Sequence, residues 1–219
     1  MSLTKEMRKM TKIFNKDEGF TGLEAAIVLI AFVVVAAVFS YVVLGAGFFT
    51  TQKAQQVIYT SVDQASSSVE IMGDVYGINE TANPTSYKYI RFTVGLTSGG
   101  SPVDFSQTTM AYSSQEYNGV EYLKNINGDH APATSPGTAV DAVISALNAG
   151  DWAVVLINNG DGATDLLLEN QEQFVIYAYP THGLVANEKF NLEISPAVGT
   201  SYVVARKAPA RVEKVDVLY

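Results

Sequence analysis

Residues 25–49 read AAIVLIAFVVVAAVFSYVVLGAGFF, a run of 25 positions without a charged side chain, and 15 of them are Ile, Leu, Val or Phe. About 20 predominantly apolar residues are enough for a helix to cross the ~30 Å hydrocarbon core of a bilayer. At about 0.3–0.6 kcal/mol for each large apolar residue, the run favours membrane insertion by about 4.5–9 kcal/mol. The single Glu24 at its edge does not cancel this. We therefore predict a membrane-spanning helix, although the Val-rich part has a β preference.

The segment before this run is basic. Residues 1–19 hold five Lys and Arg against three Asp and Glu, a net charge of +2 that leaves −10 for the rest of the chain. The positive-inside rule then keeps residues 1–19 in the cytoplasm and exports everything after about residue 50. An ordinary secretory signal has an apolar core of only about 7–15 residues. This run is too long for that, and a plain N-terminal membrane anchor is the alternative at this point.

Composition excludes several classes of protein. With 219 residues, 23.6 kDa and 47% hydrophobic residues, the chain has room for one ordinary domain and an appendage, so it is not a disordered tail. A net charge of −8 offers no basic surplus for phosphates, which argues against nucleic acid as a partner. Cysteine is absent, so the chain has no disulfide, no thiolate metal site and no cysteine nucleophile.

The helical pattern continues beyond the apolar run. Apolar residues recur at spacings of three and four among polar ones: Val57, Ile58, Val62, Ala65 and Val69. A helix from about Phe20 to about Ser68 would be roughly 74 Å long, of which a bilayer core takes about 30 Å. The outer half must cover something else, and packing against copies of the same helix is one use. Gly45, Ala46 and Gly47 would permit either close helix approach or a kink.

A short junction precedes the apolar run: residues 17–25 read DEGFTGLEA. It resembles the processing site of type IV pilin-like proteins. The resemblance implies that a membrane aspartyl peptidase cuts after Gly19, which makes Phe20 the first mature residue and Glu24 the fifth. The cut lies before the apolar run, so the mature chain would keep its helix for assembly. One departure is Glu18, where the family usually has a basic residue.

A narrower resemblance comes from residues 20–32 (FTGLEAAIVLIAF), 41–49 (YVVLGAGFF), 51–53 (TQK) and 73–77 (GDVYG). These stretches resemble archaellins of methanogens, the filament subunits of the archaeal swimming organelle. The resemblance implies a homo-oligomeric helical filament outside the cell, a membrane-inserted precursor, and assembly by a membrane platform and a motor ATPase. Two alternatives stay open from the residues: an adhesive type IV pilus subunit with the same architecture, and a monomeric anchored domain that binds a surface ligand.

Glu24 also has a physical interpretation that does not depend on the family. A carboxylate entering an apolar environment costs several kcal/mol unless it is paired. The new α-amine of Phe20, in the same or a neighbouring subunit, would supply the cation, with a reference pKa near 7.7–8. In the plainer alternative, Glu24 lies at the level of the lipid headgroups.

The exported part has a β texture, with β-branched and aromatic runs split by Gly, Pro, Asn and Asp. The predicted fold class is α+β, in which a leader (1–19) and a hydrophobic helix (20–70) precede an immunoglobulin-like antiparallel β-sandwich (71–219). One short helix is expected at residues 138–148, with Gly150 as its stop. The predicted strands are Tyr87–Leu96, Thr108–Tyr112, Val120–Leu123, Trp152–Ile157, Phe174–Tyr179, Lys189–Ile194, Ser201–Ala205 and Val212–Leu218.

Catalytic motifs are absent from the sequence. His130 and His182 are the only imidazoles, both in turn-like contexts, and no Gly-x-Ser-x-Gly, phosphate loop or His-Glu-x-x-His occurs. We predict a protein that is not an enzyme and requires no cofactor.

Residues 158–169 (NNGDGATDLLLE) place oxygen-rich side chains at alternating spacings, as Ca²⁺ loops do, but depart from EF-hand spacing. A metal-free turn explains Asn-Gly and Asp-Gly equally well. The archaellin resemblance gives Asn159, Asp161, Asp165 and Glu169 weight as candidate ligands.

Asn79-Glu80-Thr81 is an N-glycosylation sequon, whereas proline blocks the triplet at Asn83. On an exported domain, just after the predicted helix, Asn79 is a candidate for surface glycosylation.

Overall fold

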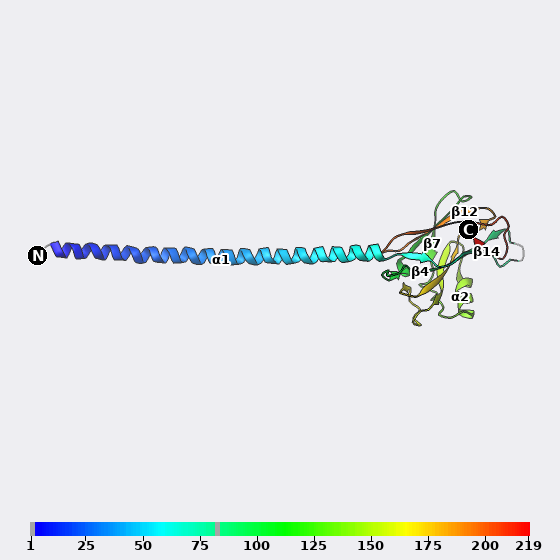
Figure 1. The fold of residues 1–219 in the computed structure, drawn as a ribbon, viewed down its shortest axis with the longest axis horizontal. Coiled ribbons are helices and arrows are strands. Elements are labelled where there is room, and N and C mark those ends of the chain that lie inside the picture. The colour runs from blue at the N-terminus through cyan, green and yellow to red at the C-terminus, as the bar shows by residue number, and fades with distance from the viewer. Residues whose placement is uncertain (1–2, 82–83) are drawn as a thin grey trace. The chain divides into compact units, whose positions relative to one another are not determined.

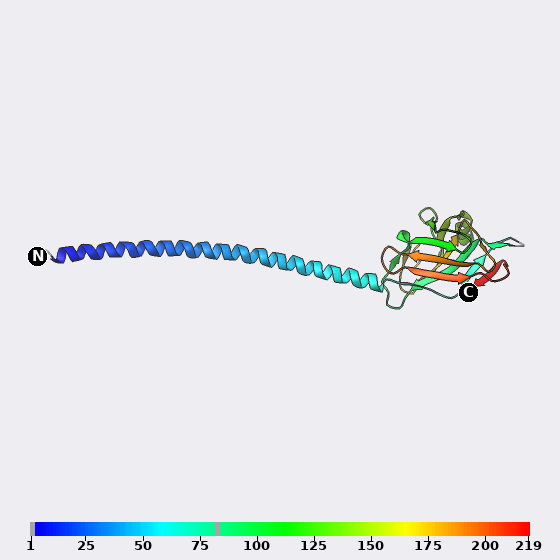
Figure 2. The same ribbon diagram turned by 90° about the horizontal axis from the view of Figure 1, so that it is seen from above.

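Helix α1 runs without interruption from Leu3 to Ser66 in the structure, a computed structural model that describes residues 3–81 and 84–219 (Figure 1). It begins earlier than the predicted start near Phe20, because the leader is rich in Lys, Met and Glu, which are good helix formers. No change of secondary structure marks the predicted leader boundary at Gly19. The helix also continues through Gly45 and Gly47, bending only gently along its length (Figure 2), so these glycines do not break it.

The chain divides by its contacts into two units, Met1–Ile58 and Tyr59–Tyr219. Among its described residues, the second unit contains one further α-helix, a short 3-10 helix η1 (Phe105–Gln107) and the strands. The helix is α2 (Thr138–Ala146), and the strands are β1 (Val69–Ile71), β2 (Val75–Ile78), β3 (Ser86–Tyr87), β4 (Tyr89–Leu96), β5 (Val103–Asp104), β6 (Thr109–Ser114), β7 (Glu121–Asn125), β8 (Asp151–Asn158), β9 (Leu167–Leu168), β10 (Gln173–Tyr179), β11 (Leu184–Val185), β12 (Lys189–Ser195), β13 (Tyr202–Lys207) and β14 (Val215–Leu218).

The eight predicted strands all overlap observed ones, namely β4, β6, β7, β8, β10, β12, β13 and β14. Helix α2 also lies where it was expected. The strands that the sequence did not reveal are β1, β2, β3, β5, β9 and β11, each of two to four residues. Such short segments carry too few residues for a periodicity signal.

Ten strands form one hydrogen-bonded sheet in the order β13-β12-β6-β7-β8-β10-β4-β2-β14, and β1 pairs with β4 beside β2. Among the described strands the ladders are antiparallel except for β7 and β8. These two run parallel, with Lys124 opposite Asp151 and Asn125 opposite Trp152. Two small two-stranded sheets, β3 with β11 and β5 with β9, complete the domain. This confirms a long helix followed by a mostly antiparallel β-rich domain.

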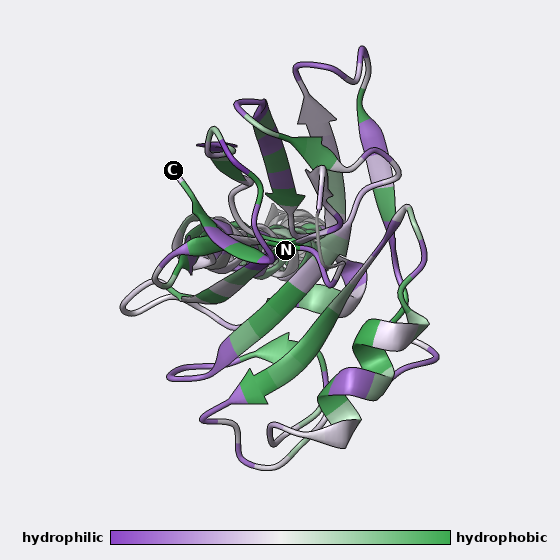
Figure 3. Ribbon diagram, turned by 90° about the vertical axis from the view of Figure 1, so that its right-hand side faces the viewer, coloured by the Kyte–Doolittle hydropathy of each residue, from purple (hydrophilic) through white to green (hydrophobic). Residues whose placement is uncertain are grey.

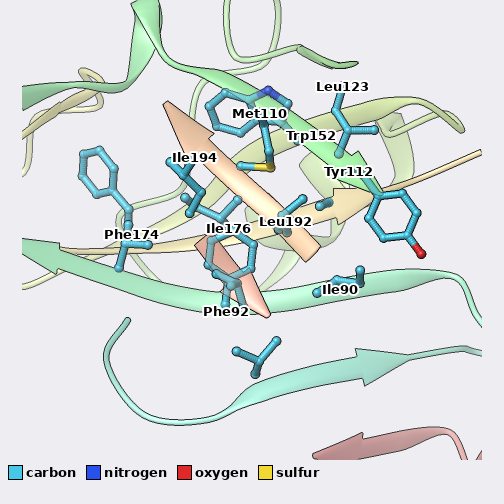
Figure 4. Packing of buried hydrophobic residues seen from close by; sticks show 14 of the residues in the cluster. Ile90, Phe92, Met110, Tyr112, Leu123, Trp152, Phe174, Ile176, Leu192 and Ile194 are labelled. Atoms are coloured by element: carbon cyan, nitrogen blue, oxygen red, sulfur yellow. The ribbon is translucent and has the colours of Figure 1, made fainter. Parts of the chain in front are cut away.

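The large sheet folds over so that the same face of its two halves lines one core. Alternate residues of β4, Ile90, Phe92 and Val94, point into it, as the two-residue period of a strand requires. Leu192 and Ile194 of β12 lie against them from the other layer (Figure 4). Figure 3 shows the apolar residues concentrated in the strands and hydrophilic ones in the loops, as expected for a domain stabilised by packing without disulfides.

Helix α2 covers the opposite face of the β4–β8–β10 layer. Its Val143 and Leu147 are buried in a second apolar cluster with Ala153 and Val155 of β8 and Tyr89 of β4. The helix ends at Ala146, and the N–H of the next residue, Leu147, donates to the Ile144 carbonyl. Gly150 follows with φ 95°, a left-handed conformation that favours glycine. The β domain therefore has three layers at this point.

The two ends of the sheet meet at the last residue of the chain. The N–H of Lys207 donates to the Tyr219 carbonyl (2.6 Å) and the N–H of Tyr219 to the Lys207 carbonyl (3.1 Å). These two bonds join the end of β13 to the segment after β14. Because an unpaired strand edge is a template for unwanted pairing, this closure protects one corner of the sheet.

Candidate assembly interface

Helix α1 carries a long apolar surface that nothing covers within its own unit. Every large apolar side chain from Leu23 to Val62 is between 52% and 80% exposed, at Val43 and Tyr41 respectively. Over Gly22–Ser66 the helix is long and apolar enough to span a membrane. Soluble monomers rarely expose apolar patches of more than a few hundred Å². This surface must therefore be covered by lipid, by other helices, or by lipid first and by other helices later.

The polar side chains that follow the glycines begin about one helical turn beyond them. The hydroxyls of Thr50 and Thr51 donate to the carbonyls of Ala46 and Gly47, at 2.8 and 2.9 Å. Threonine hydroxyls that bond to the carbonyl four residues back are hidden from an apolar environment, so both residues remain compatible with a covered helix. Lys53 follows, and its ammonium donates to the Gln56 side-chain oxygen at 3.0 Å.

A shallow groove lies on this surface at Gly47. Phe39, Val43, Phe48 and Thr51 line it around Gly47. A Cβ placed at Gly45 or Gly47 would meet no atom within 4 Å in the isolated chain. Neither glycine is therefore required by the chain's own packing. Of the two uses predicted for this segment, close approach of another helix fits an unbroken helix, whereas a sharp kink does not.

The predicted cleavage site lies inside α1. Gly19 and Phe20 are helical, and the side chain of Phe20 lies outside what the structure describes. Glu24 is exposed on the helix surface, four residues after Phe20. The structure therefore places the proposed assembly residue at the start of the uncovered apolar surface. Cleavage after Gly19 stays a prediction.

The candidate calcium loop does not gather its carboxylates. In the described part of the chain, no three Asp, Glu, His or Cys side chains lie close enough to hold a metal ion. Asp161 accepts from the N–H of Ala163 (2.8 Å) and Asp165 from the N–H of Leu167 (3.2 Å), so each holds its own turn. The N–H of Glu169 donates to Glu172 (3.0 Å), and Asn159 has φ 58°. Asp161 and Asp165 thus have backbone partners in their own turns, and calcium binding by this loop stays a prediction.

The sequon asparagine is half-buried and hydrogen-bonded. The Nδ2 of Asn79 donates to the Ser86 carbonyl at 2.5 Å, while its Oδ1 accepts from the N–H and hydroxyl of Thr81, both at 3.0 Å. A glycan would be attached at this same Nδ2. Attachment replaces one of the two hydrogens on Nδ2, so the remaining N–H can still donate to the Ser86 carbonyl. Glycosylation too stays a prediction.

Among the described residues, neither histidine lies in an arrangement of nucleophile, base and acid. His130 is exposed, and its backbone carbonyl accepts from Asn127. His182 packs against the Tyr117 ring, with 4.5 Å between centroids, and its Nδ1 lies 3.1 Å from the Thr181 hydroxyl. Neither contact supplies an acid that orients a base beside a nucleophile.

Two buried polar side chains were not singled out by the sequence. The Asn127 amide donates to the Val154 carbonyl (2.8 Å) and accepts from the Val154 N–H (2.7 Å), as a neighbouring strand would. The Glu188 carboxylate accepts from the N–H groups of Val185 (2.8 Å) and Glu116 (3.2 Å). Asn127 precedes a glycine, a pattern that predicts a turn and not a buried amide. No sequence pattern indicated the role of Glu188.

An uncovered apolar helix on an acidic β domain defines a class of protein: a surface subunit whose helix is completed by other copies. Known proteins agree. The model of the archaeal-type flagellin family matches residues 19–206. Probable flagellin 1 of Archaeoglobus fulgidus is 35% identical over 215 residues, which cover 94% of this chain and 98% of that one. A 24 kDa flagellin of Methanospirillum hungatei is 91% identical over 32 residues, 15% of this chain and 100% of that sequence.

A solved structure shows the same architecture. A chain of the archaeal flagellum of Methanospirillum hungatei strain JF1 matches with a TM-score of 0.65 and 33% identity, over 90% of this chain and 99% of that one. The chain belongs to the archaeal-type flagellin family. It is a structural subunit of an archaeal flagellar filament, a homo-oligomer at the cell surface, and the adhesive-pilus and monomeric-anchor alternatives are not favoured.

Proposed function

We propose that α1 serves this subunit twice, first as the membrane-spanning segment of a precursor and then as the core of the filament. The observation that carries the proposal is the exposure of every large apolar side chain from Leu23 to Val62 in one uninterrupted helix. Lipid covers such a surface before assembly, and identical helices cover it afterwards. The β domain then forms the outer part of the filament.

Transfer from membrane to filament needs the leader to be removed. The leader brings the net charge of +2 noted above, which holds the N-terminus in the cytoplasm. Cleavage after Gly19 removes that charge and leaves Phe20 as the first residue, so the helix can leave the bilayer. The partners of this pathway are a leader peptidase, a membrane assembly platform and a motor ATPase. The family to which the chain belongs supports all three.

The role is mechanical and involves no catalysis. Support comes from the family, whose members are flagellins. No cofactor is required for packing helices against one another.

Shearing cells and identifying the N-terminal residue of this protein in the extracellular fibres tests the proposal. We expect fibres that contain the chain with Phe20 first, and a strain lacking the chain that no longer swims but still attaches to surfaces. Recovery of the chain only in the membrane fraction, with Met1 or Ser2 as its first residue, would contradict the proposed role in the filament. Gly19→Val should leave the leader in place, whereas Gly22→Val, three residues further along, should leave cleavage unchanged.

A further inference from the structure

Only two charged residues lie between Phe20 and Val62: Glu24 near the start of the apolar surface and Lys53 just beyond its end. Both are exposed on α1 in the isolated chain. When other helices cover this surface, both charges leave water, and a buried charge without a partner is strongly unfavourable. The Lys53 ammonium donates to the neutral side-chain amide of Gln56, which does not balance its charge.

The two charges lie on the same side of the helix. They are 29 residues apart in the sequence, and 29 residues make about eight turns of an α-helix, with only about 20° of rotation left over. Their separation along the axis is about 43 Å. The residues on this side between them are apolar: Val28, Ala31, Val35, Val42, Ala46 and Phe49. Two of these, Ala31 and Ala46, are small.

We propose that Glu24 of one subunit pairs with Lys53 of another subunit, displaced by about 43 Å along a parallel helix. The proposal rests on the proposed function, because it needs the helices of several copies to lie together. In a polymer all copies point the same way, and a side that faces the axis in one copy faces it in every copy. Charges eight turns apart on that side therefore meet between staggered copies.

The pairing would also fix the register of assembly. Apolar helices slide past each other at little cost, because every displacement buries similar surface. One negative and one positive charge at the two ends of an apolar side favour a single displacement, in the way that a lone polar residue sets register in coiled coils. Each copy gives its carboxylate to one neighbour and its ammonium to another, a head-to-tail contact that propagates without closing.

Cysteine cross-linking tests the contact directly, because the native chain has no cysteine. Fibres of the full chain carrying both Glu24→Cys and Lys53→Cys should give, on oxidation, a ladder of covalent dimers, trimers and longer species. Either single variant allows dimers at most. The matched control carries Glu24→Cys with Gln55→Cys, which lies on the opposite side of the helix, and it should give no ladder.

Charge variants test the energetic side. Lys53→Met alone and Glu24→Gln alone each leave one charge unbalanced, and we expect each to lower the yield of sheared fibres at least about tenfold. The double variant, with both charges removed, should return to within about threefold of the wild-type yield, because replacing both partners of a buried pair is close to neutral. The N-terminal residue of each variant must be determined, since Glu24 lies near the cleavage site.

The outcomes separate the two proposals. If the wild-type chain never enters fibres, the proposed function itself fails. If wild-type fibres form but the 24–53 cysteine pair gives no ladder and Lys53→Met assembles normally, the inference is overturned while the proposed function stands. The cation that pairs with Glu24 would then be the α-amine of Phe20.

Discussion

At the scale of single residues, Asn127 replaces a missing strand partner beside β8. Its side chain is 7% exposed and makes three hydrogen bonds, two to the backbone of Val154 and one to the His130 carbonyl. Asn127→Ala leaves the Val154 N–H and carbonyl unsatisfied in the interior, at about 1–3 kcal/mol for each group left unpaired. We expect the free energy of unfolding to fall by about 2–4 kcal/mol.

Urea titration followed by the fluorescence of Trp152, the only tryptophan and fully buried, measures this loss on the detergent-solubilised chain. Asn191→Ala, at an exposed position of β12, is the control and should keep the wild-type midpoint. Equal midpoints for the two variants would refute the role of Asn127.

The environment of Tyr87 leads us to expect that the free energy of unfolding depends on pH in the alkaline range. Burial, followed by the hydrogen bond from its hydroxyl to the Asp216 carboxylate (2.5 Å), raises the pKa of Tyr87 well above the usual value near 10. The folded state therefore holds a proton that the unfolded state gives up near pH 10. This contribution to stability is fully present below about pH 10 and is lost as the pH rises toward the folded-state pKa.

We expect the urea midpoint of the wild-type chain to fall between pH 9 and pH 11, and to fall less steeply in Tyr87→Phe. The matched variant is Tyr122→Phe, whose ring is 77% exposed, and it should keep the wild-type slope. Identical slopes for Tyr87→Phe and the wild type would show that Tyr87 does not carry the effect.

At the scale of elements, the groove around Gly47 predicts a separation between insertion and assembly. A Cβ at position 47 meets no atom of the isolated chain within 4 Å, and Leu is a better helix former than Gly by somewhat less than 1 kcal/mol. The precursor should therefore fold and insert normally. A helix that must approach closely at Gly47 is blocked, so we expect the yield of sheared fibres to fall at least tenfold while the membrane-bound amount rises.

Gly47→Ala adds one methyl group and should have a smaller effect on fibre yield than Gly47→Leu. Wild-type yield from Gly47→Leu would mean that the glycine faces no neighbouring helix.

The loop at residues 158–169 gives a second prediction at this scale. Because Asp161 and Asp165 each hold a backbone N–H of their own turn, we expect the thermal midpoint of the chain to be the same in calcium and in EDTA. Asp161→Asn, which keeps an acceptor oxygen for the turn, should melt with the wild type in both conditions. A midpoint that rises with calcium in the wild type and not in Asp161→Asn would instead establish the metal site.

At the scale of the whole chain, the C-terminal segment holds the sheet together. Leu218 is 2% exposed, β14 pairs with β2, and Tyr219 pairs with Lys207. Deleting Val215–Tyr219 removes a buried leucine, for which loss alone costs about 2–5 kcal/mol, and leaves β2 as an open edge. We expect faster proteolysis of the β domain and a red-shifted Trp152 emission.

Deleting Tyr219 alone removes two backbone hydrogen bonds and should cost much less. If the longer deletion kept the wild-type unfolding midpoint, the closure of the sheet would contribute nothing to stability.

The sequence by itself determined the membrane-length helix, the charge asymmetry around it, the eight longer strands and the family. Each of these signals is local: a run without charges, a period of two, or a junction of a few residues. The start of α1 was misjudged, because the leader has high helix propensity that the apolar pattern does not report. The shorter strands escaped because two to four residues show no period.

The tertiary structure alone decided which distant groups meet. The parallel pairing of β7 with β8, the Asn127 amide beside Val154, and the bond from Tyr87 to Asp216 all join residues that no local pattern connects. The carboxylates of Asp161 and Asp165 are candidate ligands from their spacing and from the family resemblance, whereas in the fold each accepts a hydrogen bond from a backbone N–H of its own turn. Such contacts depend on how the sheet folds over, which is set by burial of the whole core and not by any single segment.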